Sequence, residues 1–415
     1  MRAASYSQHS NELFAPDVID DPYPLYARLR TDQPISRIAD TGVHAVATWE
    51  LIDEVLGREF DFSANLTGVL IRGEDGEPGV FDLPGLGGNH VIATADEPHH
   101  AVHRALAQPR LAAPQTKAME APIREWCQQA ITTFVEGGGG DVIPIAELIP
   151  ARAVARVLGL PDGDVSRHRA WAMMGGDILA GGVSREQLIR LATETGQMAE
   201  YLGEHLDASP SAELGDAGVP LLAALAGGVA RGEINRVEAV GIAIVMFGAA
   251  GESTAALIGS AIKRLAEAPR LASELRETPA LIPRFIEEVA RLDAPFKFHY
   301  RAVRRPCELG GVSLDEGDRL MLLWAAANRD PARFEEPDTL LMNRRHPKQH
   351  LSFGRGSHFC IGAPLARLET RIVLECLLEH TSDFTIRSDA PGVYARSIFI
   401  RRLEKLALDV SPSHA

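Results

Sequence analysis

The most specific segment of this chain reads Phe353-Gly-Arg-Gly-Ser-His-Phe-Cys360-Ile-Gly362. Cys360 follows a glycine-rich loop and directly precedes a helical pattern that extends from Ala363 to about His380. A helix N-terminus presents unpaired N–H groups and the positive end of the helix dipole, and both stabilise a thiolate. Glycines in the loop permit positive φ angles and carry no side chain, so a flat molecule can approach the sulfur closely. These glycines are Gly354, Gly356 and Gly362.

Two interpretations of Cys360 follow from this placement. A thiolate at the end of a helix can be the proximal ligand of a haem iron, where donation from sulfur favours cleavage of an O–O bond. The alternative is a buried, inert cysteine, which is common in cytosolic proteins. The complete pattern, Phe-x-x-Gly-x-x-x-Cys-x-Gly with His358 two residues before the thiol, favours the haem ligand. The segment resembles the haem-binding signature of the cytochrome P450 family.

The resemblance covers the chain from Pro22 to its end and implies a mainly α-helical fold with small accessory β-sheets. Length by itself suggests two or three domains, because the chain has 415 residues. No linker, repeat or low-complexity tract divides it, however, and the resemblance implies one large domain over residues 1–415. The expected parts are β-rich segments at about 31–60 and 295–325 and a helical core at about 99–292 and 363–380.

Local patterns refine this expectation. We predict a helix over Pro22–Arg30, a hairpin-like stretch over Ile35–Thr48 turning near Gly42, and a long, weakly periodic loop over Phe60–Thr94. Gly137–Gly140 reads as a short flexible turn. Further short strands are predicted at Val312–Leu314, Arg319–Leu323, Phe384–Arg387 and Leu406–Val410.

Composition restricts the class of protein. Hydrophobic residues make up 46% and charged residues 24% of the chain, as in an ordinary soluble globule. A net charge of −14 argues against binding to nucleic acid or to an anionic membrane surface. The segment Met1–Pro24 is polar, so we expect no signal peptide or membrane anchor. Four cysteines without CxxC spacing suggest neither disulfides nor a zinc site, and we expect a cytoplasmic protein.

The sequence also indicates where electrons come from. It contains no Walker loop and no dinucleotide-binding GxGxxG motif, so we expect no fused nicotinamide or flavin domain. The resemblance then implies a separate ferredoxin with an NAD(P)H-dependent reductase. A local basic cluster either docks an acidic ferredoxin or is an ordinary charged surface. Its members are Arg304, Arg305, Arg344, Arg345, Lys348 and Arg355.

A long central helix is predicted from Asn235, where Asn-Arg-Val-Glu forms a capping box, to Ala268, where Pro269 ends it. Its centre reads Phe247-Gly-Ala-Ala-Gly-Glu-Ser-Thr254. An acid beside a hydroxyl is costly in an apolar helix unless it faces water, a ligand or a partner. The alternative is a solvated glutamate and a serine bonded to its own helix.

Family members place a small pair, an acid and then a threonine across the oxygen side of the haem, and two registers fit here. In one, Glu252 is the acid and Ser253 the hydroxyl residue; in the other, Thr254 takes the hydroxyl place and the acid is lost. The downstream stretch Ala255–Ser260 favours the first register. The resemblance then implies that this pair delivers protons to dioxygen.

Two departures accompany this register. Ala250 stands where family members usually carry glycine, and it adds a methyl group near the dioxygen groove. Ser253 replaces the usual threonine, so it keeps the hydroxyl but loses the γ-methyl that restricts rotamers. We therefore hypothesise that the freer serine releases more peroxide than a threonine would.

Two haem propionates need cationic partners. His100 and Arg104 share a helical face and follow an Asp-x-Pro helix start. An H-x-x-x-R pair alone is common on solvated faces, but its context resembles the family's propionate-binding helix. The resemblance adds Arg301 and His358 as propionate ligands. It also implies that Phe353 shields the sulfur and that Gly354, Gly362 and Ala249 border the cofactor.

Glu288 and Arg291 form an E-x-x-R pair that resembles the family's structural ion pair. Family members often add a second arginine after Pro-x, where this chain has Thr339. The network is therefore either incomplete or completed by Arg344.

The expected substrate pocket is mostly apolar, which suits an apolar organic molecule. It draws on the 60–94 and 172–184 stretches together with Ala249, Ile398 and Phe399. Two polar residues precede Arg301, and each either contacts a substrate carboxylate or carbonyl or points outwards. They are Lys297 and His299.

These features together predict a monooxygenase that uses dioxygen and haem b (iron protoporphyrin IX), with Cys360 as the metal ligand. It would hydroxylate a small apolar organic substrate. Two alternatives remain open: a peroxide-driven haem enzyme of the same fold, and a non-catalytic haem-binding sensor or recruitment protein. The acid–hydroxyl pair disfavours both.

Overall fold

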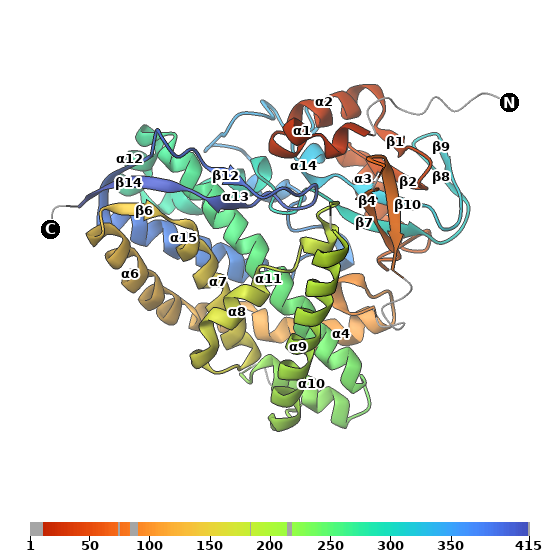
Figure 1. Cartoon of the computed structure of the whole chain (residues 1–415), viewed down its shortest axis with the longest axis horizontal. Coiled ribbons are helices and arrows are strands. Elements are labelled where there is room, and N and C mark those ends of the chain that lie inside the picture. Colours follow the sequence, from red (N-terminus) through yellow and green to blue (C-terminus); the bar gives the residue numbers. More distant parts are fainter. Residues whose placement is uncertain (1–10, 74, 84–89, 183, 214–217, 414–415) are drawn as a thin grey trace.

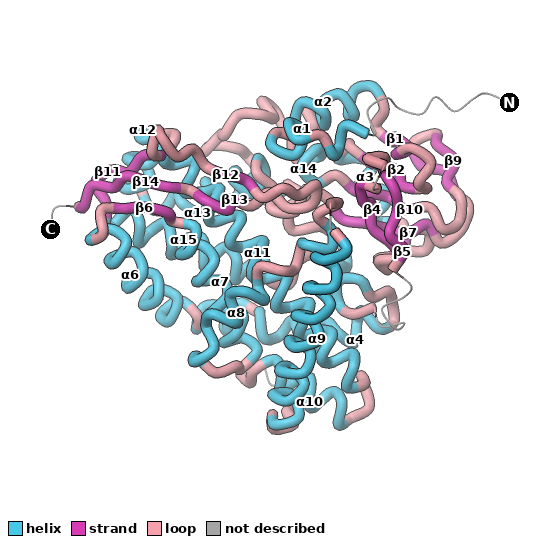
Figure 2. Tube along the Cα trace, viewed as in Figure 1, coloured by secondary structure: helices cyan, strands magenta, loops and turns pink. Residues whose placement is uncertain are grey.

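The computed structural model of the chain describes residues 11–73, 75–83, 90–182, 184–213 and 218–413. Helices form the body of the molecule, and small sheets lie along its margins (Figures 1 and 2). The expected fold class is therefore confirmed. The helices are α1 (Pro16–Asp20), α2 (Tyr23–Asp32), α3 (Trp49–Gly57), α4 (His99–Ala107), α5 (Ala113–Ala118), α6 (Glu120–Glu136), α7 (Ile143–Leu158), α8 (Val165–Ala172), α9 (Arg185–Ala208), α10 (Leu221–Ala230), α11 (Arg236–Ala266), α12 (Pro269–Glu277), α13 (Ile282–Leu292), α14 (Trp324–Ala327) and α15 (Ala363–His380).

The central helix α11 begins as the sequence predicts. Asn235 Oδ1 accepts the backbone N–H of Glu238 over 2.9 Å, and Glu238 Oε2 accepts the N–H of Asn235 over 2.7 Å, which completes the capping box. Among the described residues, α11 is the one helix long and apolar enough to cross a membrane. Most of its apolar stretch is buried inside the protein, as expected for a core helix.

The largest sheet has the strand order β1-β2-β10-β7-β3. Its strands are β1 (Ile35–Ile38), β2 (Val43–Val46), β3 (Phe62–Ser63), β7 (His299–Val303) and β10 (Arg319–Leu322). The predicted hairpin is confirmed, because β1 and β2 pair antiparallel. Strand β10 pairs parallel to β2 and antiparallel to β7, and this register sets Arg301 opposite Leu320. The sheet thus holds Arg301 between strands from distant parts of the chain.

A second sheet corrects one expectation. It has the order β11-β14-β6, with β6 (Gly139–Asp141), β11 (Thr381–Ile386) and β14 (Ala407–Pro412). Gly139 and Gly140, expected in a flexible turn, pair with Asp409 and Leu408. A Cβ on Gly139 would lie 2.4 Å from the Leu408 carbonyl oxygen, so glycine is needed where the strands approach closely.

The described part of the 60–94 stretch contains more regular structure than predicted. Residues 74 and 84–89 lie outside the described residues. Strands β4 (Gly68–Arg72) and β5 (Pro78–Asp82) form an antiparallel hairpin there. Leu70 is buried and donates its N–H to the Tyr300 hydroxyl over 3.0 Å. The glycine and aspartate residues of this stretch have low strand propensity, so the local sequence does not indicate the two strands. The hairpin forms because the strands pair with each other.

The remaining strands are β8 (Cys307–Leu309), β9 (Val312–Leu314), β12 (Val393–Tyr394) and β13 (Leu403–Lys405). Strand β9 has the predicted bounds. The bounds of β10, β11 and β14 agree with the predicted ones to within a few residues. The largest apolar core surrounds α11 and includes α6, α7 and α15. Two smaller cores lie beneath the five-stranded sheet and around α3. The glycine-rich segment that ends in Cys360 lies directly before α15 in the chain.

Candidate functional site

Cys360 lies immediately before α15, as predicted. Its backbone N–H donates to the Phe353 carbonyl over 2.8 Å, which closes the loop on itself. The Cys360 side chain keeps exposed surface, but the protein atoms packed around it partly desolvate the thiol and raise its pKa, while the N–H groups of Gly362 and Ala363 act in the opposite direction. The geometry supplies the N–H groups that a thiolate needs at this helix end.

The loop glycines divide into two kinds. Gly354 and Gly356 have φ values of +67° and +72°, so both use the left-handed region that favours glycine. Gly362 has φ −83° and is the N-cap residue of α15, so it does not use the positive φ that a glycine permits. Phe353 carries the guanidinium of Arg367 at 4.3 Å from its ring centroid. This stack fixes the ring that was expected to shield the sulfur.

Four predicted propionate ligands converge from three elements. The rings of His100, from α4, and His358, from the cysteine loop, stack with centroids 3.9 Å apart. Burial, together with the nearby Arg301, His100 and Arg104, lowers the pKa of His358 to about 3. The structure therefore brings together side chains that are far apart in the sequence.

These cations lack enough anions of their own. Arg301 is buried and donates to the Tyr300 carbonyl, and burial lowers its pKa to about 10. Within the described ranges, Arg301, Arg104 and His358 form no ion pair, whereas His100 contacts Glu97. Arg301 is buried and Arg104 is half-buried, and cations without counter-ions favour an anionic ligand. The neutral His358 ring beside them can donate an N–H, so these residues fit a haem with two propionates. A cavity of about 190 Å³ opens beside Arg301 and His358.

Helix α11 keeps one open face in an otherwise buried stretch. Ala249 and Ser253 lie one turn apart and retain exposed surface, whereas Glu252 and Thr254 are 1% and 3% exposed. The Ser253 hydroxyl donates to the Ala249 carbonyl over 2.6 Å. Ser253 therefore shows the self-bonded state considered above, but on a face that can meet a ligand. Thr254 lies on a different, buried face.

Glu252 is not the solvated glutamate of the alternative reading. Its Oε2 accepts the Gly176 backbone N–H over 2.7 Å, and its Oε1 accepts Nε of Arg402 over 3.2 Å. Burial raises the pKa of Glu252 to about 7, although Arg402 and the Gly176 amide oppose that rise. Arg402 was not predicted as a partner of Glu252, because no local sequence pattern links it to α11, which lies far away in the chain.

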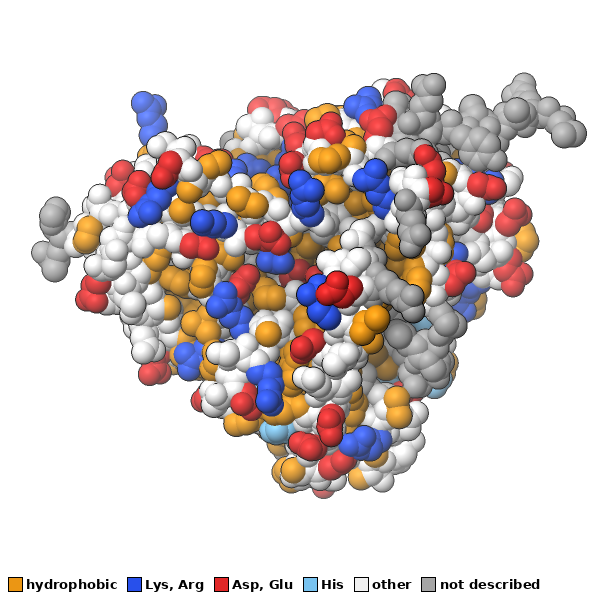
Figure 3. Space-filling view, viewed as in Figure 1, with side chains coloured by type: hydrophobic (Ala, Val, Ile, Leu, Met, Phe, Trp, Pro, Cys, Tyr) orange, Lys and Arg blue, Asp and Glu red, His pale blue; other side chains and the backbone are white. Residues whose placement is uncertain are grey.

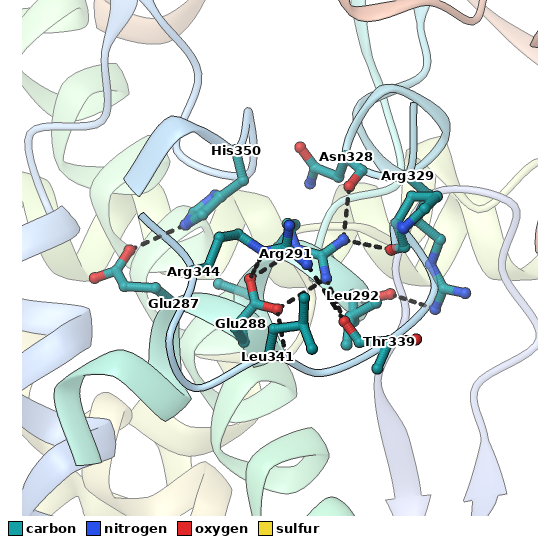
Figure 4. Close-up of polar contacts among 12 residues, drawn as sticks. Glu287, Glu288, Arg291, Leu292, Asn328, Arg329, Thr339, Leu341, Arg344 and His350 are labelled. Carbon is teal, nitrogen blue, oxygen red and sulfur yellow. Dashed lines mark hydrogen bonds and ion pairs between the residues drawn. The ribbon is translucent and has the colours of Figure 1, made fainter. Parts of the chain in front are cut away.

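The E-x-x-R pair forms a buried network (Figure 4). Arg291 donates to both carboxylate oxygens of Glu288 over 2.8 and 2.9 Å. Arg344 donates to the same carboxylate over 2.9 Å, so Arg344 completes the network in place of an arginine at position 339. The neighbouring Glu287 binds His350 over 3.0 Å and thereby ties α13 to the segment before the cysteine loop.

Ion pairs involve most members of the expected basic cluster. Arg345 and Lys348 alone among its members form no ion pair with another described residue. The paired members are Arg304 with Asp96, Arg305 with Asp61, Arg344 with Glu288 and Arg355 with Asp53. On the face drawn in Figure 3, cationic and anionic side chains are likewise interspersed.

The side chains of Lys297 and His299 form hydrogen bonds with other residues of the protein. Lys297 Nζ donates to the Ser397 carbonyl over 2.8 Å, and burial lowers its pKa to about 7. His299 Nδ1 accepts Nε1–H of Trp324 over 2.6 Å, and burial lowers the pKa of His299 to about 3. Lys297 therefore does not point outwards, and both side chains have protein partners.

Two of the expected pocket stretches meet. The Ile398 N–H donates to the Ala180 carbonyl over 3.0 Å, which joins the C-terminal segment to the 172–184 stretch. The Phe399 ring stacks on Phe296 with centroids 4.6 Å apart. Residue 183 lies outside the described residues. The walls brought together here are apolar, as predicted.

Comparisons with known proteins match this geometry. The cytochrome P450 family model matches residues 230–391. Cytochrome P450 144 of Mycobacterium tuberculosis is 40% identical over 410 residues, which cover 97% of this chain and 92% of that protein. The crystal structure of CalO2 superposes with a TM-score of 0.82 at 27% identity, over 96% of this chain and 98% of that one. P450BioI, solved in complex with hexadec-9Z-enoic acid ligated acyl carrier protein, gives a TM-score of 0.82 at 25% identity, over 95% and 99%.

Proposed function

The chain belongs to the cytochrome P450 family of haem b-dependent monooxygenases, and we propose that it inserts one atom of dioxygen into a C–H bond of an apolar organic substrate. The observation that carries this proposal is that Cys360, at the start of α15, lies in the same site as two arginines that form no ion pair with a described residue, Arg301 and Arg104. In this proposal the whole chain acts as one domain in the cytoplasm.

We assign the residues that would hold the cofactor as follows. Cys360 would bind the iron, and Phe353, Gly354, Gly362 and Ala249 would border the ring. His100, Arg104, Arg301 and His358 would bind the propionates. Haem held by a cysteine thiolate activates dioxygen, and donation from sulfur favours O–O bond cleavage.

Proton delivery falls to Glu252 and Ser253. A carboxyl group with a pKa of about 7 can both take up and release a proton near neutral pH. The Ser253 hydroxyl on the open face of α11 can hold a water or an oxygen atom of the reactants. Thr254, buried beside them, has a supporting place in the helix and no direct contact with the open face.

The proposed substrate is apolar because Ile398, Phe399 and Phe296 bring apolar surface to the pocket stretches. The fatty acyl group named in the P450BioI complex is consistent with an apolar guest in this fold. The proposed electron donor is a ferredoxin reduced by an NAD(P)H-dependent reductase, because the sequence contains no nicotinamide- or flavin-binding motif.

Replacing the thiolate tests the proposal. Cys360→Ser should abolish the thiolate-type carbon monoxide spectrum and product formation, while Cys307→Ser, in a different part of the fold, should leave both intact. A screen of apolar compounds for a low-spin to high-spin shift should then identify ligands. Full turnover by Cys360→Ser contradicts the proposal. Turnover with peroxide but not with ferredoxin indicates the peroxide-driven alternative.

A further inference from the structure

Arg367 holds its cation against the ring of Phe353, directly behind the cysteine loop. It lies in the second turn of α15, and its guanidinium carbon is 4.3 Å from the centre of the Phe353 ring. Phe353 begins the loop that ends in Cys360, and its carbonyl accepts the Cys360 N–H over 2.8 Å. The Arg367 side chain is 23% exposed, so water screens its charge only in part. The same phenylalanine thus contacts both the cation and the cysteine.

Glu287, in α13, fixes this guanidinium through two parallel hydrogen bonds. Nε of Arg367 donates to Oε1 over 2.6 Å, and Nη2 donates to Oε2 over 3.0 Å. A bidentate pair fixes the orientation of the guanidinium plane as well as its position. Burial would raise the pKa of Glu287, but hydrogen bonds from His350 and Arg367 lower it to about 2. Glu287 is therefore a permanent anion near neutral pH.

His350 binds the same carboxylate from the segment before the loop. Its Nδ1 accepts the Ser352 N–H over 3.3 Å, so Nε2 carries the proton and donates to Oε2 of Glu287 over 3.0 Å. Figure 4 shows the side chains of Glu287 and His350 turned towards each other. The His350 ring lies 5.8 Å from the Phe353 ring, between centroids. Glu287 therefore holds two side chains that pack beside Phe353.

This cluster is separate from the network of the neighbouring Glu288. The two cations that bind Glu288 are Arg291 and Arg344, and they lie over a different ring, that of Phe334. Consecutive glutamates of α13 thus hold arginines against two different phenylalanines. The Glu287 cluster is the one beside the cysteine loop.

We propose that Glu287 is a positioning residue that holds the Arg367 cation beside Phe353 and thereby sets the reduction potential of the haem in this site. Reduction adds one negative charge to the site, and a nearby cation favours the more negative state through Coulomb attraction. Charged and hydrogen-bonding groups around an axial ligand are among the means by which a protein adjusts such a potential. The inference rests on the proposed function, but its test needs neither substrate nor turnover.

The test is a spectroelectrochemical redox titration of the substrate-free holoprotein. Arg367→Met removes the cation, so the equilibrium constant for one-electron reduction should fall about tenfold, which corresponds to a potential about 59 mV more negative. Arg371→Met is the matched control, because Arg371 lies one turn later in α15 and pairs with Glu120 and Glu375 over 2.9 and 2.8 Å. This control should change the constant by less than about twofold, since its charge is already paired.

Glu287→Gln distinguishes positioning from a simple effect of charge. Loss of an anion by itself would favour reduction and make the potential less negative. Release of Arg367 from its fixed place should instead make the potential more negative, as in Arg367→Met. The double variant should shift no further than Arg367→Met alone, because the two residues act as one unit. Arg367→Lys keeps a cation but cannot form the two parallel hydrogen bonds, so its negative shift should be smaller.

An unchanged potential in Arg367→Met, or a less negative potential in Glu287→Gln, would overturn the inference. Both variants are measured with the thiolate-type carbon monoxide spectrum and circular dichroism as checks of the folded site. If Arg367→Met does not bind haem, the sign of the shift in Glu287→Gln decides the question. A wild-type protein without the thiolate-type spectrum would instead contradict the proposed function.

Discussion

Arg344 donates from Nε to Oε1 of Glu288 over 2.9 Å and thereby completes the buried network that Arg291 begins (Figure 4). The position that often carries this arginine in the family is Thr339. Its side chain is no cation, but its backbone carbonyl accepts Nη2–H of Arg291 over 2.9 Å. Arg344, which comes later in the chain than Thr339, therefore supplies the second cation that binds the Glu288 carboxylate.

Arg344→Met should destabilise the fold by about 3 kcal/mol, because it removes one cation from a buried carboxylate and leaves its charge under-compensated. Arg345→Met, at the exposed neighbouring position without an ion pair, should change stability little. Urea unfolding followed by circular dichroism and haem absorbance measures both. Equal stability of the two variants would show that Arg344 is dispensable.

Ser253→Thr should lower the peroxide released per electron pair by about twofold, because the added γ-methyl removes competing rotamers of the hydroxyl. Thr254→Ser is the matched control, since Thr254 is buried on another face of α11 and should not affect peroxide yield. Peroxide and NADPH are assayed together with a plant-type ferredoxin and its reductase. A peroxide yield that does not fall in Ser253→Thr removes the hypothesis.

Arg345→Ala should raise the apparent KM for an acidic ferredoxin by about threefold and weaken its dependence on salt, as expected for an exposed charge at the rim of an interface. Arg305→Ala should have a smaller effect, because Asp61 already neutralises Arg305 over 2.7 Å. Steady-state kinetics at increasing ionic strength distinguish the two. Identical salt profiles in wild type and Arg345→Ala would exclude Arg345 from the docking surface.

Lys297 should make stability depend on pH in the alkaline range. Its pKa is lowered from 10.5 to about 7 by burial, so between these values the unfolded chain binds a proton that the folded protein does not. The free energy of unfolding should therefore rise with pH across this window, by on the order of 3 kcal/mol. Below the folded pKa, lysine is charged in both states and the cost of burying it is fully present.

Urea unfolding of Lys297→Met at a series of pH values checks this sign. The variant should lose the rise, whereas Lys405→Met, at an exposed position in β13, should keep it. The comparison holds even though Lys297→Met also leaves the Ser397 carbonyl without its 2.8 Å donor, because that loss does not vary with pH. Parallel pH curves for wild type and Lys297→Met would contradict the lowered pKa.

Local patterns were sufficient for the parts of the fold that depend on neighbouring residues. The helix after the cysteine was predicted over Ala363–His380 and has those bounds, and the capping box at Asn235 marks the start of α11. Capping and helical periodicity act within a few residues, so they can be read directly from the chain. The residues around Cys360 similarly carry the family resemblance that implies the haem cofactor.

Strand β7 lies in the segment expected to be β-rich, at about 295–325, but no individual strand was predicted there, because its residues become a strand through pairing with β10 and β3. Ion-pair partners that are far apart along the chain could not be predicted for the same reason. Nothing near Glu252 in the sequence indicates Arg402, and nothing near Arg304 or Arg305 indicates the aspartates that neutralise them. Charge and proton affinity depend on groups within a few ångströms in space, and folding brings those groups together from any separation along the chain. The residue types of the site could therefore be read from the sequence, whereas their ionisation and their partners became apparent only once the chain was folded.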